Sequence, residues 1–275
     1  MTTTTQSGGD RSFDAVSAAK ESNVRRERFS VAGAVTVDAR TASGVALVRV
    51  GASDACEVTV SAKNRAARER LGEVEISYDE SSRTLMVITQ PRSLSRRWIF
   101  DIGRSDFNVE LAVPEGSDLK VRTASGDVRA TGTFGQVAVS SASGQVFLGE
   151  VRGSCEVTLA SGDAEIHEVH GPVRVKTASG DVTVRRAHDD ARLQSVSGNV
   201  ELGVAAGLEA RLNSVSGNIL VRLDKGLAVD VDASTVSGDL RSEIDLSGPS
   251  GVSVDGVTVT IKASTVSGDV KVRRA

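Results

Sequence analysis

The phrase TASGDV stands at Thr123–Val128 and recurs, letter for letter, at Thr177–Val182. Variants of this phrase, in which Ser-Gly precedes Asp, Asn or Gln, are centred on Ser125, Ser143, Ser161, Ser179, Ser197, Ser216, Ser237 and Ser267. The first four intervals between these serines are 18 residues each, and the next three are 19, 21 and 30. A fixed period of this kind is the sequence signature of a repeat architecture, so the repeat decides the fold.

Apolar and polar residues alternate on both sides of each Ser-Gly, as in Val182, Thr183 and Val184. A period of two predicts two short strands per repeat, each with one buried face. Stacked coils account for the fixed spacing, because every coil must bury its apolar side against its neighbours. The sequence therefore predicts an all-β fold, a single-chain β-solenoid or β-helix of about eight two-strand coils with parallel pairing between coils.

The Ser-Gly phrase is expected to turn a corner of every coil. Glycine accepts a positive φ there, and the acid or amide after it can accept hydrogen bonds from backbone N–H groups. Stacked carboxylates could instead hold Ca²⁺ or act as an acid–base pair, but Ca²⁺ takes about six to eight oxygen ligands and each turn offers about one. The residues interpreted as structural turns are Gly126, Asp127, Gly144, Gly162, Asp163, Gly180, Asp181, Gly198, Asn199, Gly217, Asn218, Gly238, Asp239, Gly268 and Asp269.

Composition divides the chain into three parts. Residues 1–22 are rich in Thr, Ser and Gly without periodicity and are expected to be a disordered tail. Residues 23–113 are expected to form an irregular, strand-rich segment that caps the solenoid, and residues 114–275 the regular solenoid. An insertion near 243–258 breaks the period and is expected to fold over the last coils.

The irregular segment carries a further corner phrase, TASG at Thr41–Gly44, so the stack of coils can begin there. Its one helical stretch is KNRAARERLG, at 63–72. Strands are expected at Ser30–Ala39, Val45–Val50, Glu57–Ser61, Glu73–Tyr78, Thr84–Thr89 and Phe107–Val113. At the other end, Lys271, Arg273 and Arg274 are expected to place charge on the final strand and to discourage edge pairing.

Charge and hydropathy exclude several classes of partner. A net charge of −3 and a pI near 5.7 give no reason to expect nucleic acid or an anionic membrane. The start of the chain has no basic and apolar secretion signal, and no apolar run reaches the roughly 18 residues of a membrane-spanning helix. Two separate cysteines make no disulfide framework. We expect a cytoplasmic, reduced protein without membrane insertion.

Three histidines are the candidate metal ligands. His170 and His188 occupy the same column of the repeat, and His167 lies nearby. Stacked imidazoles could bind Zn²⁺ or Ni²⁺, but neighbouring loop histidines without a fixed ligand motif are more often solvated. No metal and no cofactor are therefore predicted. Cys155 falls in an inward column and is expected to be a core residue, as is Cys56.

The run of TASGDV and SVSGNV coils, after a strand-rich segment with a VPEG lead-in at 113–116, resembles a bacterial β-strand-repeat family. This family is common in actinobacteria and is labelled a candidate adhesin domain of unknown function. The resemblance covers about residues 25–275 and implies a β-helix. It carries no catalytic motif, so it implies no site residues.

These observations predict a non-enzymatic scaffold that presents an extended surface to a protein or glycan. The first alternative is a carbohydrate-active β-helix enzyme, a lyase or hydrolase, and the second is a self-assembling cytoskeletal β-helix. The packing of the single Trp98 onto the first coils is favoured over a docking role. We expect a monomer or small oligomer, because both ends of the solenoid carry irregular segments.

Overall fold

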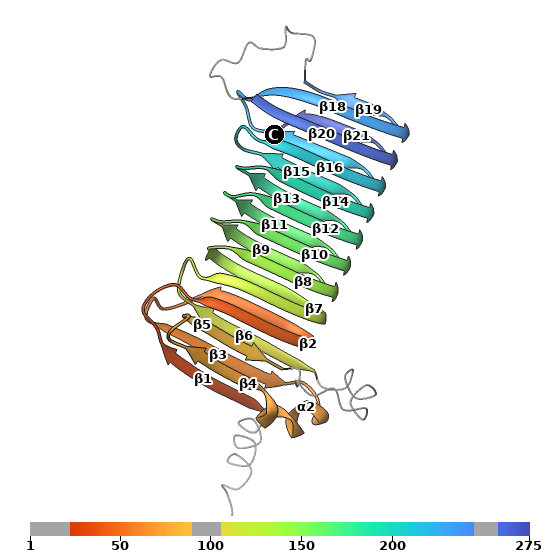
Figure 1. The fold of residues 1–275 in the computed structure, drawn as a ribbon. Helices are drawn as coiled ribbons and strands as arrows, with labels where there is room; N and C mark the ends of the chain where they lie inside the picture. Colours follow the sequence, from red (N-terminus) through yellow and green to blue (C-terminus); the bar gives the residue numbers. More distant parts are fainter. Residues whose placement is uncertain (1–22, 90–105, 245–257) are drawn as a thin grey trace, which may run out of the picture.

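The computed structural model describes residues 23–89, 106–244 and 258–275. Strands stacked one coil upon another form a long ladder in which almost every described residue takes part (Figure 1). No helix among these residues has the length and apolar character needed to cross a membrane. The predicted tail, Trp98 and most of the predicted insertion lie outside the described residues.

Each regular coil contributes one strand to each of two parallel faces of the solenoid. Face one holds the strands that precede the Ser-Gly corner, and face two holds the strands that follow it. β7 (Asp118–Phe134) runs through its corner and serves both faces. The other strands of face one are β8 (Val137–Ser143), β10 (Cys155–Ser161), β12 (Val173–Ser179), β14 (Ala191–Ser197), β16 (Glu209–Ser216), β20 (Thr258–Ser267) and β18 (Ala228–Ser237). Those of face two are β9 (Val146–Val151), β11 (Ala164–Val169), β13 (Val182–Ala187), β15 (Val200–Val204), β17 (Ile219–Leu223), β21 (Val270–Arg274) and β19 (Leu240–Ser242).

The core is the narrow space between the two faces. Equivalent residues of successive coils pair in register, so that Val157 lies beside Val175 and Val175 beside Leu193. All three are fully buried, as are Val182 and Val184 on face two. Small branched side chains fill this space without voids and keep the faces close. The predicted β-solenoid and its eight coils from Asp118 onward are confirmed.

The amino-terminal segment continues the ladder and then changes its direction. Its elements are β1 (Val24–Ser30), β2 (Thr36–Val50), β3 (Ala55–Ala62), α2 (Arg65–Glu69), the 3₁₀ turn η1 (Leu71–Glu73), β4 (Glu75–Asp79), β5 (Thr84–Ile88) and β6 (Phe107–Val113). β2 is a complete coil, because its TASG phrase pairs with that of β7, Thr41 beside Thr123 and Gly44 beside Gly126. β5 and β6 lie parallel to β2, whereas β4, β3 and β1 add antiparallel strands beyond them.

The single strand predicted at Ser30–Ala39 is wrong. β1 ends at Ser30 and β2 begins at Thr36, with Gly33 between them at a φ of 85°. A positive φ of this size leaves the extended conformation, so the chain bends there. The predicted helix is confirmed in part, because α2 covers five of its residues.

The last coils do not stack in chain order. β20 pairs with β16 on one side and β18 on the other, and β21 likewise lies between β17 and β19. The end of the ladder is therefore the coil of β18 and β19 (Figure 1). This corrects the predicted edge role of Lys271, Arg273 and Arg274, because β21, which holds Lys271, Arg273 and Arg274, is an inner strand.

Inward residues account for this inversion. The coil of β20 and β21 buries Ile261 and Val272, whereas the coil of β18 and β19 has Ser242 at the position that matches Val272. A hydroxyl without a partner in the apolar core costs about 1–3 kcal/mol. The coil that carries Ser242 therefore takes the end, where this side chain is exposed.

Candidate functional site

The Ser-Gly corners form a structural ladder. The corner glycines of the regular coils from Gly144 onward have φ between 128° and 155°. Gly126 is the exception, because β7 runs through this corner as one strand. Each turn acid accepts from the next coil: Asp181 N donates to Asp163 Oδ1 at 2.9 Å, and Asn199 N donates to Asp181 Oδ1 at 2.7 Å.

The same contact recurs along the column, with Asp127, Asn199, Asn218 and Asp269 as acceptors. An oxygen of each of these side chains thus already caps a backbone N–H group of the adjacent coil. The column holds the corners of successive coils together, and its acids are committed to that task.

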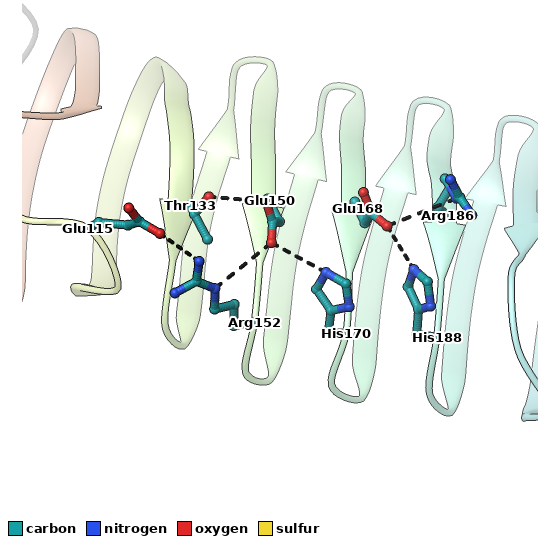
Figure 2. Close-up of polar contacts among 8 residues, drawn as sticks. All are labelled: Glu115, Thr133, Glu150, Arg152, Glu168, His170, Arg186 and His188. Atoms are coloured by element: carbon teal, nitrogen blue, oxygen red, sulfur yellow. Dashed lines mark hydrogen bonds and ion pairs between the residues drawn. The ribbon is translucent and has the colours of Figure 1, made fainter.

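A second polar column lies near the opposite corner and joins carboxylates to histidines (Figure 2). His170 and His188 directly follow β11 and β13, and their rings stack with centroids 4.6 Å apart and an angle of 20° between planes. His188 Nε2 lies 2.8 Å from Glu168 Oε1, and His170 Nε2 lies 3.4 Å from Glu150 Oε1. Each histidine therefore meets the carboxylate of the preceding coil. We call these four residues the Glu–His ladder.

Two arginines flank the Glu–His ladder. Arg152 lies 3.9 Å from Glu150 and 2.6 Å from Glu115, and Arg186 lies 4.0 Å from Glu168 and 3.2 Å from Asp224. The hydrogen bond from His188, together with the charge of Arg186, holds the pKa of the Glu168 carboxyl below its usual value.

The predicted histidine pair is thus brought together, with a carboxylate that sequence reasoning did not assign to it. The donor atoms of Glu168, His170 and His188 all lie within 4.8 Å of one another. His167 is not part of this group, and it is exposed on β11.

Both cysteines are core residues. Cys155 lies between Val137 and Val173 and is 1% exposed, and Cys56 is fully buried. Burial raises the pKa of the Cys155 thiol to about 12 and that of Cys56 to about 11. A thiolate is the reactive form of cysteine, so neither side chain is set up as a nucleophile.

Sequence reasoning missed an apolar column on the outer side of face one. Val196, Val215, Val266 and Val236 occupy equivalent positions of the last four coils and are exposed by 53%, 49%, 50% and 82%. We call this column the valine stripe. Leu240 is the one other large hydrophobic side chain exposed in the described part of the chain, and it belongs to the same end coil.

A row of cations runs beside the valine stripe. Arg174, Arg192, Arg211 and Lys262 pair in register across four successive coils, four residues before the stripe on the same strands or their neighbours. We call these residues the cation row. Glu209 binds Arg211 at 2.8 Å and Lys262 at 3.3 Å. Within the described ranges, no ion pair joins Arg174 or Arg192 to another side chain.

The sequence did contain a signal for this surface. The column that ends in the valine stripe holds alanine in earlier coils, at Ala142, Ala160 and Ala178. A change from alanine to valine at an outward position adds apolar surface where the core gains nothing. That change is a property of the column and is invisible in any single repeat.

Face two carries a shallow groove over the earlier coils. Its volume is about 340 Å³, and its lining includes Leu47, Asp127, Phe147 and Glu165. The Arg129 guanidinium lies 5.9 Å from the centre of the Phe147 ring. An aromatic ring with charged neighbours in a groove can stack on an apolar or sugar surface and donate or accept hydrogen bonds around it.

Solved structures share this fold at low sequence identity. A candidate adhesin from Bacteroides fragilis NCTC 9343 is 10% identical, with 92% of this chain and 97% of that chain covered and a TM-score of 0.50. A candidate adhesin from Parabacteroides merdae ATCC 43184 is 11% identical over 91% and 96% of the two chains, with a TM-score of 0.39. A protein from Parabacteroides distasonis ATCC 8503, described as a candidate lipid-binding protein, is 12% identical over 91% and 96%, with a TM-score of 0.43.

A search for relatives among curated proteins gave no match. The Toastrack DUF4097 family, a domain family of unknown function, matches residues 46–273. This span begins within β2, the first complete coil, and ends in β21, so it covers the whole stack. The resemblance found in the repeat is confirmed, and the chain belongs to the Toastrack DUF4097 family.

Proposed function

We propose that the protein is a non-enzymatic, adhesin-like scaffold that binds a partner protein through the outer side of face one. The observation that carries this proposal is the valine stripe, which leaves four apolar side chains in line on a rigid surface. Contiguous exposed apolar surface beside polar groups is typical of sites where proteins bind one another.

The dimensions of the surface suit a protein segment. Coils are about 4.8 Å apart, so the valine stripe and the cation row are each about 14 Å long. The two columns are four residues apart along each strand, which is about 13 Å. A partner that fits both would place aliphatic side chains on the valine stripe and acidic side chains opposite Arg174 and Arg192.

Paired substitutions in one column test this proposal. Val215→Glu places a charge in the valine stripe, whereas Ala142→Glu places the same charge at the equivalent position of an earlier coil. Both positions are exposed, so both variants should fold. Proteins recovered from the native cell extract on immobilised wild type, Val215→Glu and Ala142→Glu are compared by quantitative mass spectrometry.

We expect a partner that is recovered on wild type and Ala142→Glu and is lost from Val215→Glu. Equal recovery on the two variants would contradict a role for the valine stripe. Glycan binding is a separate outcome, for which the groove at Phe147 is the candidate. A glycan array on which Phe147→Ala loses binding would favour that groove, and cleavage of the bound glycan would replace the scaffold by an enzyme.

A further inference from the structure

We propose that Glu168, His170 and His188 form a surface site for one late first-row transition metal ion, Zn²⁺, Cu²⁺ or Ni²⁺. The site joins two adjacent coils, because Glu168 and His170 belong to one coil and His188 to the next. It is independent of the valine stripe, which lies on other strands.

The distances between the donor atoms fit one ion. Two ligand atoms at about 2.1 Å from Zn²⁺ and at right angles to each other are about 3 Å apart. His188 Nε2 and Glu168 Oε1 are 2.8 Å apart, so this pair can chelate almost without movement. All three donors lie within 4.8 Å, so His170 closes the site by a movement of less than about 2 Å. Its side chain is 41% exposed and free to rotate.

The donor set selects the class of metal. Two imidazoles and one carboxylate suit Zn²⁺, Cu²⁺ and Ni²⁺, whereas Ca²⁺ and Mg²⁺ require oxygen donors. Affinity for nitrogen ligands rises along the first row to Cu²⁺, so Cu²⁺ should bind more tightly than Ni²⁺ or Zn²⁺. The ion takes the place of the proton between His188 and Glu168, and this proton passes to solvent.

The surrounding charges tolerate an added cation. Glu150 lies 3.4 Å from His170 and can move in as a further ligand or hold the imidazole in position. Arg186 approaches Glu168 at 4.0 Å but has a closer partner in Asp224, at 3.2 Å. Arg152 likewise has Glu115 at 2.6 Å. Both arginines can therefore move away from the ion without losing their partners.

Titration calorimetry of the full chain, without a polyhistidine tag, tests the site with ZnCl₂, NiCl₂ and CuCl₂. We expect one ion per chain, and Cu²⁺ electron paramagnetic resonance should show coupling to two nitrogen nuclei. Loss of outer-shell groups alone weakens metal sites about 10–100-fold. We therefore expect His170→Ala and His188→Ala each to weaken binding at least about tenfold.

His167→Ala is the matched control, because it removes an exposed histidine of the same coil outside the site. It should leave the affinity unchanged. Glu168→Gln keeps the size of the side chain and serves as the second variant if an alanine variant fails to melt like wild type. The proposal is overturned by absence of saturable binding, by equal affinity of the His170→Ala/His188→Ala double variant and wild type, or by an equal loss in His167→Ala.

Discussion

Replacement of Gly180 by alanine is the sharpest test of the corner geometry. Gly180 has a φ of 130°, which costs about 1–3 kcal/mol for any residue with a side chain. A Cβ placed there would lie 2.6 Å from the carbonyl carbon of Gly162 and closer still to its oxygen. The corner would have to open by roughly 1 Å, because ordinary contacts between carbon atoms begin near 3.5 Å.

Opening the corner weakens two backbone hydrogen bonds of the coil ladder. Gly180 N donates to Ser197 O at 2.9 Å, and Gly162 N donates to Ser179 O at 2.8 Å. Each contributes about 0.5–1.5 kcal/mol. Together with the backbone cost, Gly180→Ala should lower the free energy of unfolding by about 3–5 kcal/mol. For a chain of this size that corresponds to a fall in Tm of roughly 6–20 °C.

Two other glycines provide controls. Gly226 has a φ of 88° with nothing within 4 Å of an added Cβ, so Gly226→Ala should show the backbone cost alone, about 1–2 kcal/mol. Gly72 has an equally open site without a positive φ, and Gly72→Ala should be within about 0.5 kcal/mol of wild type. Urea denaturation followed by circular dichroism measures all three. Equal losses in Gly180→Ala and Gly226→Ala would refute the stacking argument.

Three further outcomes follow from burial. Val184→Asp places a charge in the core and should lower Tm far more than Thr183→Asp, which points outward; equal Tm values would refute the strand phase. Val272→Ser places a hydroxyl in the coil between β17 and β19 and should cost about 2–3 kcal/mol in urea denaturation; a loss under about 0.5 kcal/mol would contradict the explanation of the coil order. Because burial raises the pKa of both thiols, Cys56 and Cys155 should not react with Ellman's reagent at pH 7.5 in the folded chain and should both react in guanidinium; rapid reaction of the folded protein would contradict their burial.

The period of the repeat is sufficient to predict the coils and the buried columns, because every coil solves the same packing problem. Val157, Val175 and Leu193 recur at the period of the phrase, and they pair in register. The inverted order of the last coils cannot be predicted in this way. The phrases ASTVSGDL at 233–240 and ASTVSGDV at 263–270 are nearly identical, so local sequence treats the two coils as equivalent. Their order depends on which inward side chains meet in the stack.

The candidate metal site is predictable only in part. His170 and His188 share a column, so their proximity follows from the period alone. Glu168 stands two positions before His170, and its contact is with His188 of the next coil. This diagonal contact depends on side-chain direction at the end of a strand, which the period does not determine. For the same reason, an acid next to a histidine in sequence is no guide to its partner in space.

Inward and outward columns of this solenoid obey different constraints, and the difference indicates where function resides. An inward residue must fit the same narrow space in every coil, so Val, Leu, Ile and Ala alternate there with little change along the stack. An outward residue meets only solvent and its column neighbours, so a systematic change there has no packing cause. Two such changes occur: alanine gives way to valine from Val196 onward, and histidine follows Arg152 in the column of His170 and His188. The first change adds exposed apolar surface and the second places two imidazoles side by side; neither enlarges the buried core. We therefore expect substitutions in these two outward columns to alter binding with little effect on stability, and substitutions in the inward columns to do the reverse.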